Sequence, residues 1–269
     1  MATRSSRMVK AGGSTRGPLR GNAPLAAYVL HRYDWSESSL VLDLFTREQG
    51  RIAVVAKGAK RPYSQLRSVL LAFQRITVSL GRVPSDSAAS DVQTLRGAEW
   101  AGGGAMLTGS ALFSGFYLNE LLMKLLARHD PHTTLFDMYA QTLPSLALVD
   151  DGSVQAALRA FELSLLREIG VLPDLSLVTL TQEPVRAEGL YALLPEMGVS
   201  TPRDGDAAVS GHALTTLQAA LVHGSLPALQ QACAGSLQVL KGLLRELIQY
   251  HLGSAPLRTR QVMLGLQSL

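Results

Sequence analysis

The apolar pattern of this chain changes its period at a run of three glycines, residues 102–104. Before the run, short apolar segments alternate between two faces and are separated by turn residues, a pattern typical of β-strands. The expected strands span residues 25–30, 40–46, 51–56, 73–80 and 92–95. Five short strands within about 75 residues favour a small closed barrel, because closure leaves no exposed strand edge.

After the glycines, apolar residues recur at helical spacing. Phe113, Tyr117 and Leu121 lie four residues apart in a segment, 110–128, that ends before Asp130-Pro131. Further helices are expected over residues 134–148, 154–169, 212–223, 226–234 and 236–252. The segment 173–210 contains four prolines and is expected to be irregular. The pattern therefore predicts a multidomain α and β chain, with a β-barrel domain at 23–104 and an all-α helical domain at 105–269.

The net charge of +4 hides an asymmetry between the two predicted domains. Residues 1–82 carry 14 Lys and Arg against 4 Asp and Glu, a net charge of +10, whereas the remainder carries 11 against 17, a net charge of −6. Residues 1–22 are a basic, Gly- and Ser-rich tail that we expect to be disordered. Without them the first domain keeps a charge of +5. This bias predicts a polyanionic partner, most often nucleic acid.

The densest basic segment follows the third expected strand. No acidic residue occurs between Arg51 and Arg82. A basic loop at the mouth of a small barrel presents cations to phosphates without reading sequence. The candidate nucleic-acid-binding residues are Arg47, Arg51, Lys57, Lys60, Arg61 and Arg67. Tyr33, Trp35 and Tyr63 are aromatic candidates for base stacking, although each of these rings is also consistent with a place in the core.

The helical half offers a second type of surface. Leu158 and Phe161 share an apolar stripe with Arg159 beside it, and Lys241 and Arg245 lie one turn apart on the last long helix. A hydrophobic groove edged by cations would suit an acidic peptide that ends in an apolar residue. Amphipathic helices usually bury such a stripe in their own core, so packing is the alternative interpretation.

Signatures of the common catalytic and metal sites are missing from the sequence. It has no G-x-x-x-x-G-K-S/T loop, no G-x-G-x-x-G, no G-x-S-x-G and no H-E-x-x-H. Cys233 is the single cysteine, which excludes a four-cysteine zinc site and an internal disulfide and suits a reducing compartment. No apolar run approaches the roughly 20 residues of a membrane helix. We therefore expect a cytoplasmic binding protein, not an enzyme, with no cofactor, no metal and no membrane contact.

Several sequence blocks resemble the bacterial RecO recombination mediators in order and spacing. In the first half these blocks are SESSL at 36–40, LFT at 44–46, GR at 50–51 and VAKGAKR at 55–61. In the second half they are FSGFYLNELL at 113–122, RAFEL at 159–163 and HLG followed by PLRTR within 251–260. The resemblance covers residues 25–264.

This resemblance implies an N-terminal OB-fold, a helical C-terminal domain and a nucleoid-associated role in DNA repair. It further implies binding to single- and double-stranded DNA, annealing of complementary strands, and help in placing RecA on DNA coated by the single-stranded DNA-binding protein. The implied protein partners are RecR and the acidic, Phe-ending tail of the single-stranded DNA-binding protein. We carry Arg159, Lys241 and Arg245 over as candidates for contacting that tail.

One departure from the family concerns zinc. Many RecO proteins carry a four-cysteine zinc module between two helical segments, and residues 173–210 of this chain contain no cysteine. In this respect the chain is similar to the enterobacterial-type members, in which the module is degenerate. The residues alone leave two alternatives open. One is an OB-fold RNA-binding or translation-associated module, because an OB surface accommodates either nucleic acid. The other is a small enzyme that carries no known motif.

Overall fold

The first half of the chain folds into a closed barrel. The structure is a computed structural model that describes residues 23–81, 92–103, 105–254 and 256–267. The barrel strands are β1 (Leu25–Asp34), β2 (Leu40–Thr46), β3 (Gly50–Ala56), β4 (Arg75–Leu80) and β5 (Val92–Trp100). They close in the order β1-β2-β3-β5-β4, with β3 and β5 parallel and the other neighbours antiparallel. A short helix, α1 (Leu66–Val69), lies between β3 and β4, so the barrel is OB-like as expected.

Strand β2 shows how the alternating sequence fills two cores. Leu42 and Leu44 point into the barrel, where they pack with Ile52 and Val54 of β3. Phe45 points the other way and is just as buried, because it belongs to the core of the helical half. Where Phe45 lies, the outer face of the barrel is therefore an interface with the helical half.

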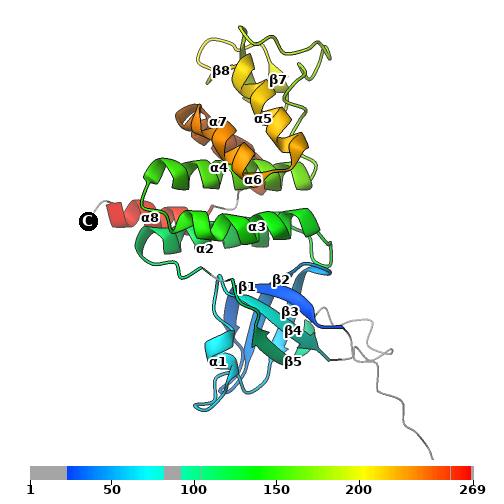
Figure 1. Cartoon of the computed structure of the whole chain (residues 1–269), viewed down its shortest axis with the longest axis vertical. Coiled ribbons are helices and arrows are strands. Elements are labelled where there is room, and N and C mark those ends of the chain that lie inside the picture. Colours follow the sequence, from blue (N-terminus) through cyan, green and yellow to red (C-terminus); the bar gives the residue numbers. More distant parts are fainter. Residues whose placement is uncertain (1–22, 82–91, 104, 255, 268–269) are drawn as a thin grey trace, which may run out of the picture.

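The second half is built around one central helix. Helices α2 (Gly109–Leu125) and α3 (Thr133–Leu146) separate the barrel from α4 (Asp151–Glu168), as Figure 1 shows. Beyond α4 lie α6 (Leu226–Ala234) and α7 (Leu237–Leu252), and α8 (Arg258–Gln267) returns to pack on α2. Helix α4 is buried over most of its circumference from Ala156 to Leu166. Its N-terminus is capped by Asp150, whose carboxylate accepts a hydrogen bond from the Ser153 amide at 2.7 Å.

Three features were not predicted from the sequence: the short helix α1, a sheet within residues 190–210, and α8. The segment expected to be irregular contains a three-stranded sheet made of β6 (Leu190–Leu194), β7 (Gly198–Ser200) and β8 (Val209–Ser210), followed directly by α5 (Gly211–His223). The sheet lies at the end of the molecule opposite the barrel (Figure 1). The prediction also stopped at residue 252 and missed α8. The basic tail, residues 1–22, falls outside the described residues.

The two domains meet through aromatic packing. The rings of Tyr28 and Phe45, on the outer face of the barrel, lie 5.3 and 5.4 Å from the ring of Phe136 on α3. The Asn119 side chain of α2 donates a hydrogen bond to the backbone carbonyl of Leu30 at 2.9 Å. The barrel is therefore held against the helices by buried contacts. Among the described residues, no helix is both long and apolar enough to cross a bilayer.

Candidate nucleic-acid interface

The basic loop after β3 has a defined shape. Gly58 adopts a left-handed conformation (φ +71°), which lets the chain turn beneath the Arg61 side chain, 3.6 Å from the position a Cβ would take. The Lys60 amide donates to the Ser38 carbonyl at 3.0 Å, which ties the loop to the connection between β1 and β2. The loop thus presents its cations from a fixed backbone.

Three cations of the loop region are exposed and unengaged. Within the described part of the chain, the side chains of Lys57, Arg61 and Arg67 have no hydrogen bond or ion pair. Lys60 is partly held, because its ammonium group lies 3.1 Å from Asp34 Oδ1 and donates to the Ser36 carbonyl at 3.0 Å. These four predicted residues therefore lie together at one end of the barrel, with their charges available to a ligand.

Arg47 lies at the interface between the barrel and the helical domain. Its guanidinium group donates two hydrogen bonds to the carboxylate of Asp137 on α3, at 3.0 and 2.8 Å. These bonds lower the pKa of Asp137 and raise that of Arg47. Both side chains are about two-fifths exposed (41% and 45%), so this ion pair lies at the rim of the interface.

Arg51 lies at the same interface and is more deeply buried than Arg47. Its guanidinium group donates to the carbonyls of Met123 and Leu126, which are otherwise unpaired at the C-terminal end of α2. It also lies 3.7 Å from the buried carboxylate of Asp43, and burial lowers the pKa of the guanidinium group. Arg47 and Arg51 are thus occupied by protein partners, and of the six candidates only Lys57, Arg61 and Arg67 are both exposed and unpaired within the described residues.

All three aromatic candidates are exposed, Tyr33 the least, at 43%. Tyr63 is fully exposed on the basic loop, and Trp35 is 70% exposed beyond the end of β1. Tyr33 also has partners within the protein: its hydroxyl donates to Asp43 at 3.4 Å and its ring packs edge-on against His31. Tyr63 and Trp35 are therefore open to stacking, whereas Tyr33 is already engaged.

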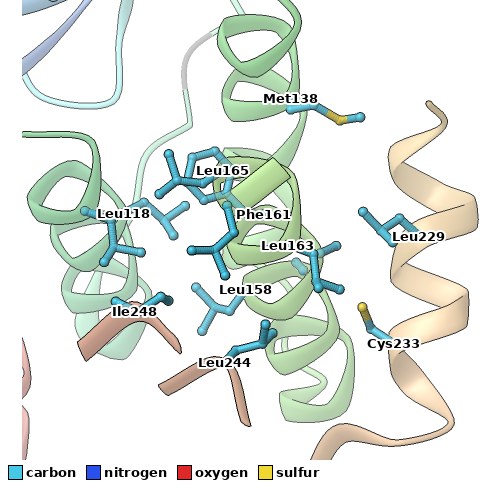
Figure 2. Close-up of a cluster of buried hydrophobic side chains, with 14 of the residues drawn as sticks. Leu118, Met138, Leu158, Phe161, Leu163, Leu165, Leu229, Cys233, Leu244 and Ile248 are labelled. Carbon is cyan, nitrogen blue, oxygen red and sulfur yellow. The ribbon is translucent and has the colours of Figure 1, made fainter. Parts of the chain in front are cut away.

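The apolar stripe on α4 is part of the core. Figure 2 shows Leu158 and Phe161 packed toward Leu118 of α2 and toward Leu244 and Ile248 of α7. Phe161 is completely buried and Leu158 is 7% exposed. The stripe is therefore packed within the protein itself, which was the alternative interpretation. These two side chains leave no groove for a peptide.

Arg159 is buried as well and pairs within its own helix. Its guanidinium group donates to Glu162 Oε1 at 2.6 Å, and the hydroxyl of Tyr117 on α2 donates to the same oxygen at 2.6 Å. Burial raises the pKa of Glu162, and Arg159 opposes that rise. In contrast, Lys241 and Arg245 are exposed on α7.

Arg260 on α8 was not among the candidates from the sequence. The positive charge of Arg260 opposes the rise that burial causes in the pKa of Tyr117. Burial lowers the pKa of Arg260 itself, and the charge of Arg245 lowers it further. Arg245 on α7 and Arg260 on α8 therefore influence each other electrostatically, although they come from different helices. Arg260 belongs to the PLRTR block, and the two arginines of that block were the sequence signal for a basic site there.

Within the described residues, no group of three His, Cys, Asp or Glu side chains is placed to hold a metal ion. Cys233 is completely buried on α6 (Figure 2), and burial raises the pKa of its thiol to about 12. A thiol in this state is a small apolar side chain, as the sequence suggested.

The arrangement defines a class of protein, an OB-like barrel with a basic loop joined rigidly to a helical domain. The family model described as "Recombination protein O N terminal" matches residues 24–101, and the model described as "Recombination protein O C terminal" matches residues 106–261. The chain belongs to the RecO family, whose members act in DNA repair and recombination.

Curated relatives agree over nearly the whole chain. The "DNA repair protein RecO" of Variovorax paradoxus is 50% identical over 253 residues, covering 90% of this chain and 96% of the relative. The proteins of the same name from Verminephrobacter eiseniae and Albidiferax ferrireducens are each 50% identical over 245 residues, with 90% of this chain and 96% and 95% of the relatives covered.

Proposed function

We propose that this protein is a non-catalytic DNA-binding recombination mediator. It binds single- and double-stranded DNA, anneals complementary strands, and helps to load RecA on DNA coated by the single-stranded DNA-binding protein. The observation that carries the proposal is the set of unengaged cations, Lys57, Arg61 and Arg67, on the loop and short helix α1 that connect β3 and β4 of an OB-like barrel. Cations without protein partners are free to displace the counterions of a phosphate backbone.

Annealing follows from the same charges. Two DNA strands repel each other through their phosphates, and a basic surface that neutralises part of that charge lowers the repulsion. The surface does not need to read bases, because base pairing between the strands supplies the specificity. The mediator role adds a second contact, to the acidic tail of the single-stranded DNA-binding protein. Two linked contacts raise the effective concentration of the protein on coated DNA.

The tail contact is proposed for the exposed cations of the helical domain. Lys241 and Arg245 are exposed one turn apart on α7, and the charge of Arg245 also acts on Arg260 of α8. An acidic peptide is complementary to this group of charges. RecR is the further partner proposed.

Charge reversal tests the DNA surface directly. Arg61→Glu removes one exposed cation of the loop, and Arg186→Glu makes the same change of charge at an exposed position of the helical domain, just before β6. Fluorescence anisotropy with single-stranded DNA over a range of salt concentrations should show weaker binding for Arg61→Glu only. Its dependence on log salt should be shallower by about 0.7 for each lost phosphate contact. Equal effects of both variants would overturn the proposal.

Two further assays separate the parts of the proposal. Competition between single-stranded DNA and RNA of equal length tests the alternative module, since a strong preference for RNA would favour that reading. Isothermal titration of an acidic, Phe-ending peptide should show weaker binding to Lys241→Ala and Arg245→Ala than to the wild type. Unchanged peptide affinity in both variants would remove the tail contact from the proposal.

A further inference from the structure

A cavity of about 510 Å³ opens beside the basic loop. Three parts of the barrel domain line it: the C-terminal end of β1, the loop after β3, and helix α1. Figure 1 shows α1 on the flank of the barrel. Its apolar lining includes Leu66 and Leu70, and its polar lining is Arg32, Asp34, Lys60 and Arg67. The volume falls within the range of about 300–1,000 Å³ that is typical of small-ligand sites. The lining is thus both apolar and charged.

The cations of this cavity are arranged for a phosphate. Arg67 is exposed and, within the described residues, its side chain has no partner. Arg32 donates to the Leu70 carbonyl at 3.3 Å through one of its nitrogens, which leaves its other N–H groups for a ligand. Lys60 is fixed between Asp34 and the Ser36 carbonyl. A phosphate near Arg32 and Arg67 would be neutralised by charge-assisted hydrogen bonds.

Asp34 is the one acid of the cavity lining, and phosphate binding alone gives no reason for it. Arg32 and Asp34 lie two residues apart on β1 and therefore point to the same side of the strand. Asp34 Oδ1 pairs with Lys60 at 3.1 Å, and Oδ2 has no partner among the described residues, with the side chain 80% exposed. A carboxylate only accepts hydrogen bonds, so its free oxygen favours a ligand that carries an amino group.

We propose that this cavity takes one unstacked nucleotide of single-stranded DNA and favours cytosine over an oxo-pyrimidine. The phosphate binds Arg32 and Arg67, the base packs on Leu40 and Leu66, the partly exposed leucines of the lining, and the cytosine 4-amino group donates to Asp34. A uracil or thymine ring presents a carbonyl oxygen at the same position, which the carboxylate repels. Cytosine N4 is a known partner of Asp and Glu in base readout. The inference rests on the proposed DNA binding and adds a base preference to it.

The test compares two pyrimidine tracts that differ at the 4-position. Labelled 15-mers of deoxycytidine and deoxyuridine are titrated by fluorescence anisotropy at pH 8 and fixed salt. The wild type should bind the cytidine tract about fivefold more tightly, a smaller ratio than a bidentate base contact gives. Asp34→Ala should bring the ratio to about one. Both affinities also change when a negative charge is lost, so the ratio is the quantity to measure.

Matched variants give the controls. Glu37→Ala removes an exposed carboxylate three residues along the chain and outside the cavity lining, and should leave the ratio unchanged. Arg67→Ala should weaken binding to both tracts equally. A wild-type ratio of one, or a ratio that survives in Asp34→Ala, would overturn the base preference while DNA binding stands. Failure of the wild type to bind either tract would instead overturn the proposed function.

Discussion

The buried ion pair on α4 gives a large and specific prediction. Glu162 is completely buried, and its carboxylate is held by Arg159 and by the Tyr117 hydroxyl. Arg159→Ala would leave this carboxylate in the core without its cation. Breaking a buried pair in this way costs about 3–5 kcal/mol, whereas total stabilities of proteins are about 5–15 kcal/mol. The variant should therefore lose a large part of its free energy of unfolding.

Urea unfolding followed by circular dichroism measures the loss. At an m value near 2 kcal/mol/M, a cost of about 4 kcal/mol lowers the midpoint by about 2 M. Lys241→Ala, an exposed cation on α7, is the matched control and should change stability by no more than about 0.5 kcal/mol. The double variant Arg159→Met, Glu162→Gln should recover at least half of the loss, because it removes the uncompensated charge.

The pH dependence provides a second check. Burial raises the pKa of Glu162 above its ordinary value of 4.5, and removal of Arg159 raises it further. An acid whose folded pKa is raised stabilises the protein below its unfolded pKa and loses that contribution as pH increases. The cost of Arg159→Ala should therefore be greatest at neutral pH and shrink toward pH 4.5. A loss below about 1 kcal/mol at pH 7, the scale of an exposed pair, would refute the reasoning.

Three further changes have expected outcomes. Gly50→Ala should cost at least about 3 kcal/mol in urea unfolding, since a Cβ there would lie 1.9 Å from the Asp130 carbonyl oxygen at a φ of +66°; a cost below 1 kcal/mol would contradict the packing. Arg47→Ala should cost less than about 1 kcal/mol at pH 7, and the difference from wild type should vanish in acid once Asp137 protonates; a difference that persists in acid would rule out this pair as its cause. Cys233, with a thiol pKa of about 12, should resist iodoacetamide at pH 8 in the native protein and react in urea, and rapid native labelling would show an open site.

The sequence pattern predicted the barrel and the longest helices because each has a clear period. It predicted the positions of cations less well, since a charge is compatible with a phosphate, a carboxylate or a helix end. Arg51 is adjacent to the basic loop in sequence, yet its guanidinium group caps α2, more than 70 residues away. The spacing of Arg159 and Glu162 at i and i+3 is a local signal for an ion pair within the helix, and it favours the buried pairing over a role at the surface.

The missed elements are short and depend on distant contacts. Strands β7 and β8 span only residues 198–200 and 209–210, too few to show a period. They form because β6 pairs with both of them. Helix α8 begins where the Arg258 and Thr259 amides donate to the Glu120 carboxylate of α2, at 2.8 and 2.9 Å. A helix capped by a side chain from more than 130 residues away has no local start signal.

The aromatic contact between barrel and helices bears on how such a chain can evolve. Two family models meet between residues 101 and 106, which suggests two exchangeable modules. However, Tyr28 and Phe45 complete the core around Phe136. Cutting the polypeptide in this linker would expose complementary aromatic faces on both halves. We expect each half to be soluble only when both are produced together. Grafting the barrel of a distant relative onto these helices would therefore require a matching aromatic face as well.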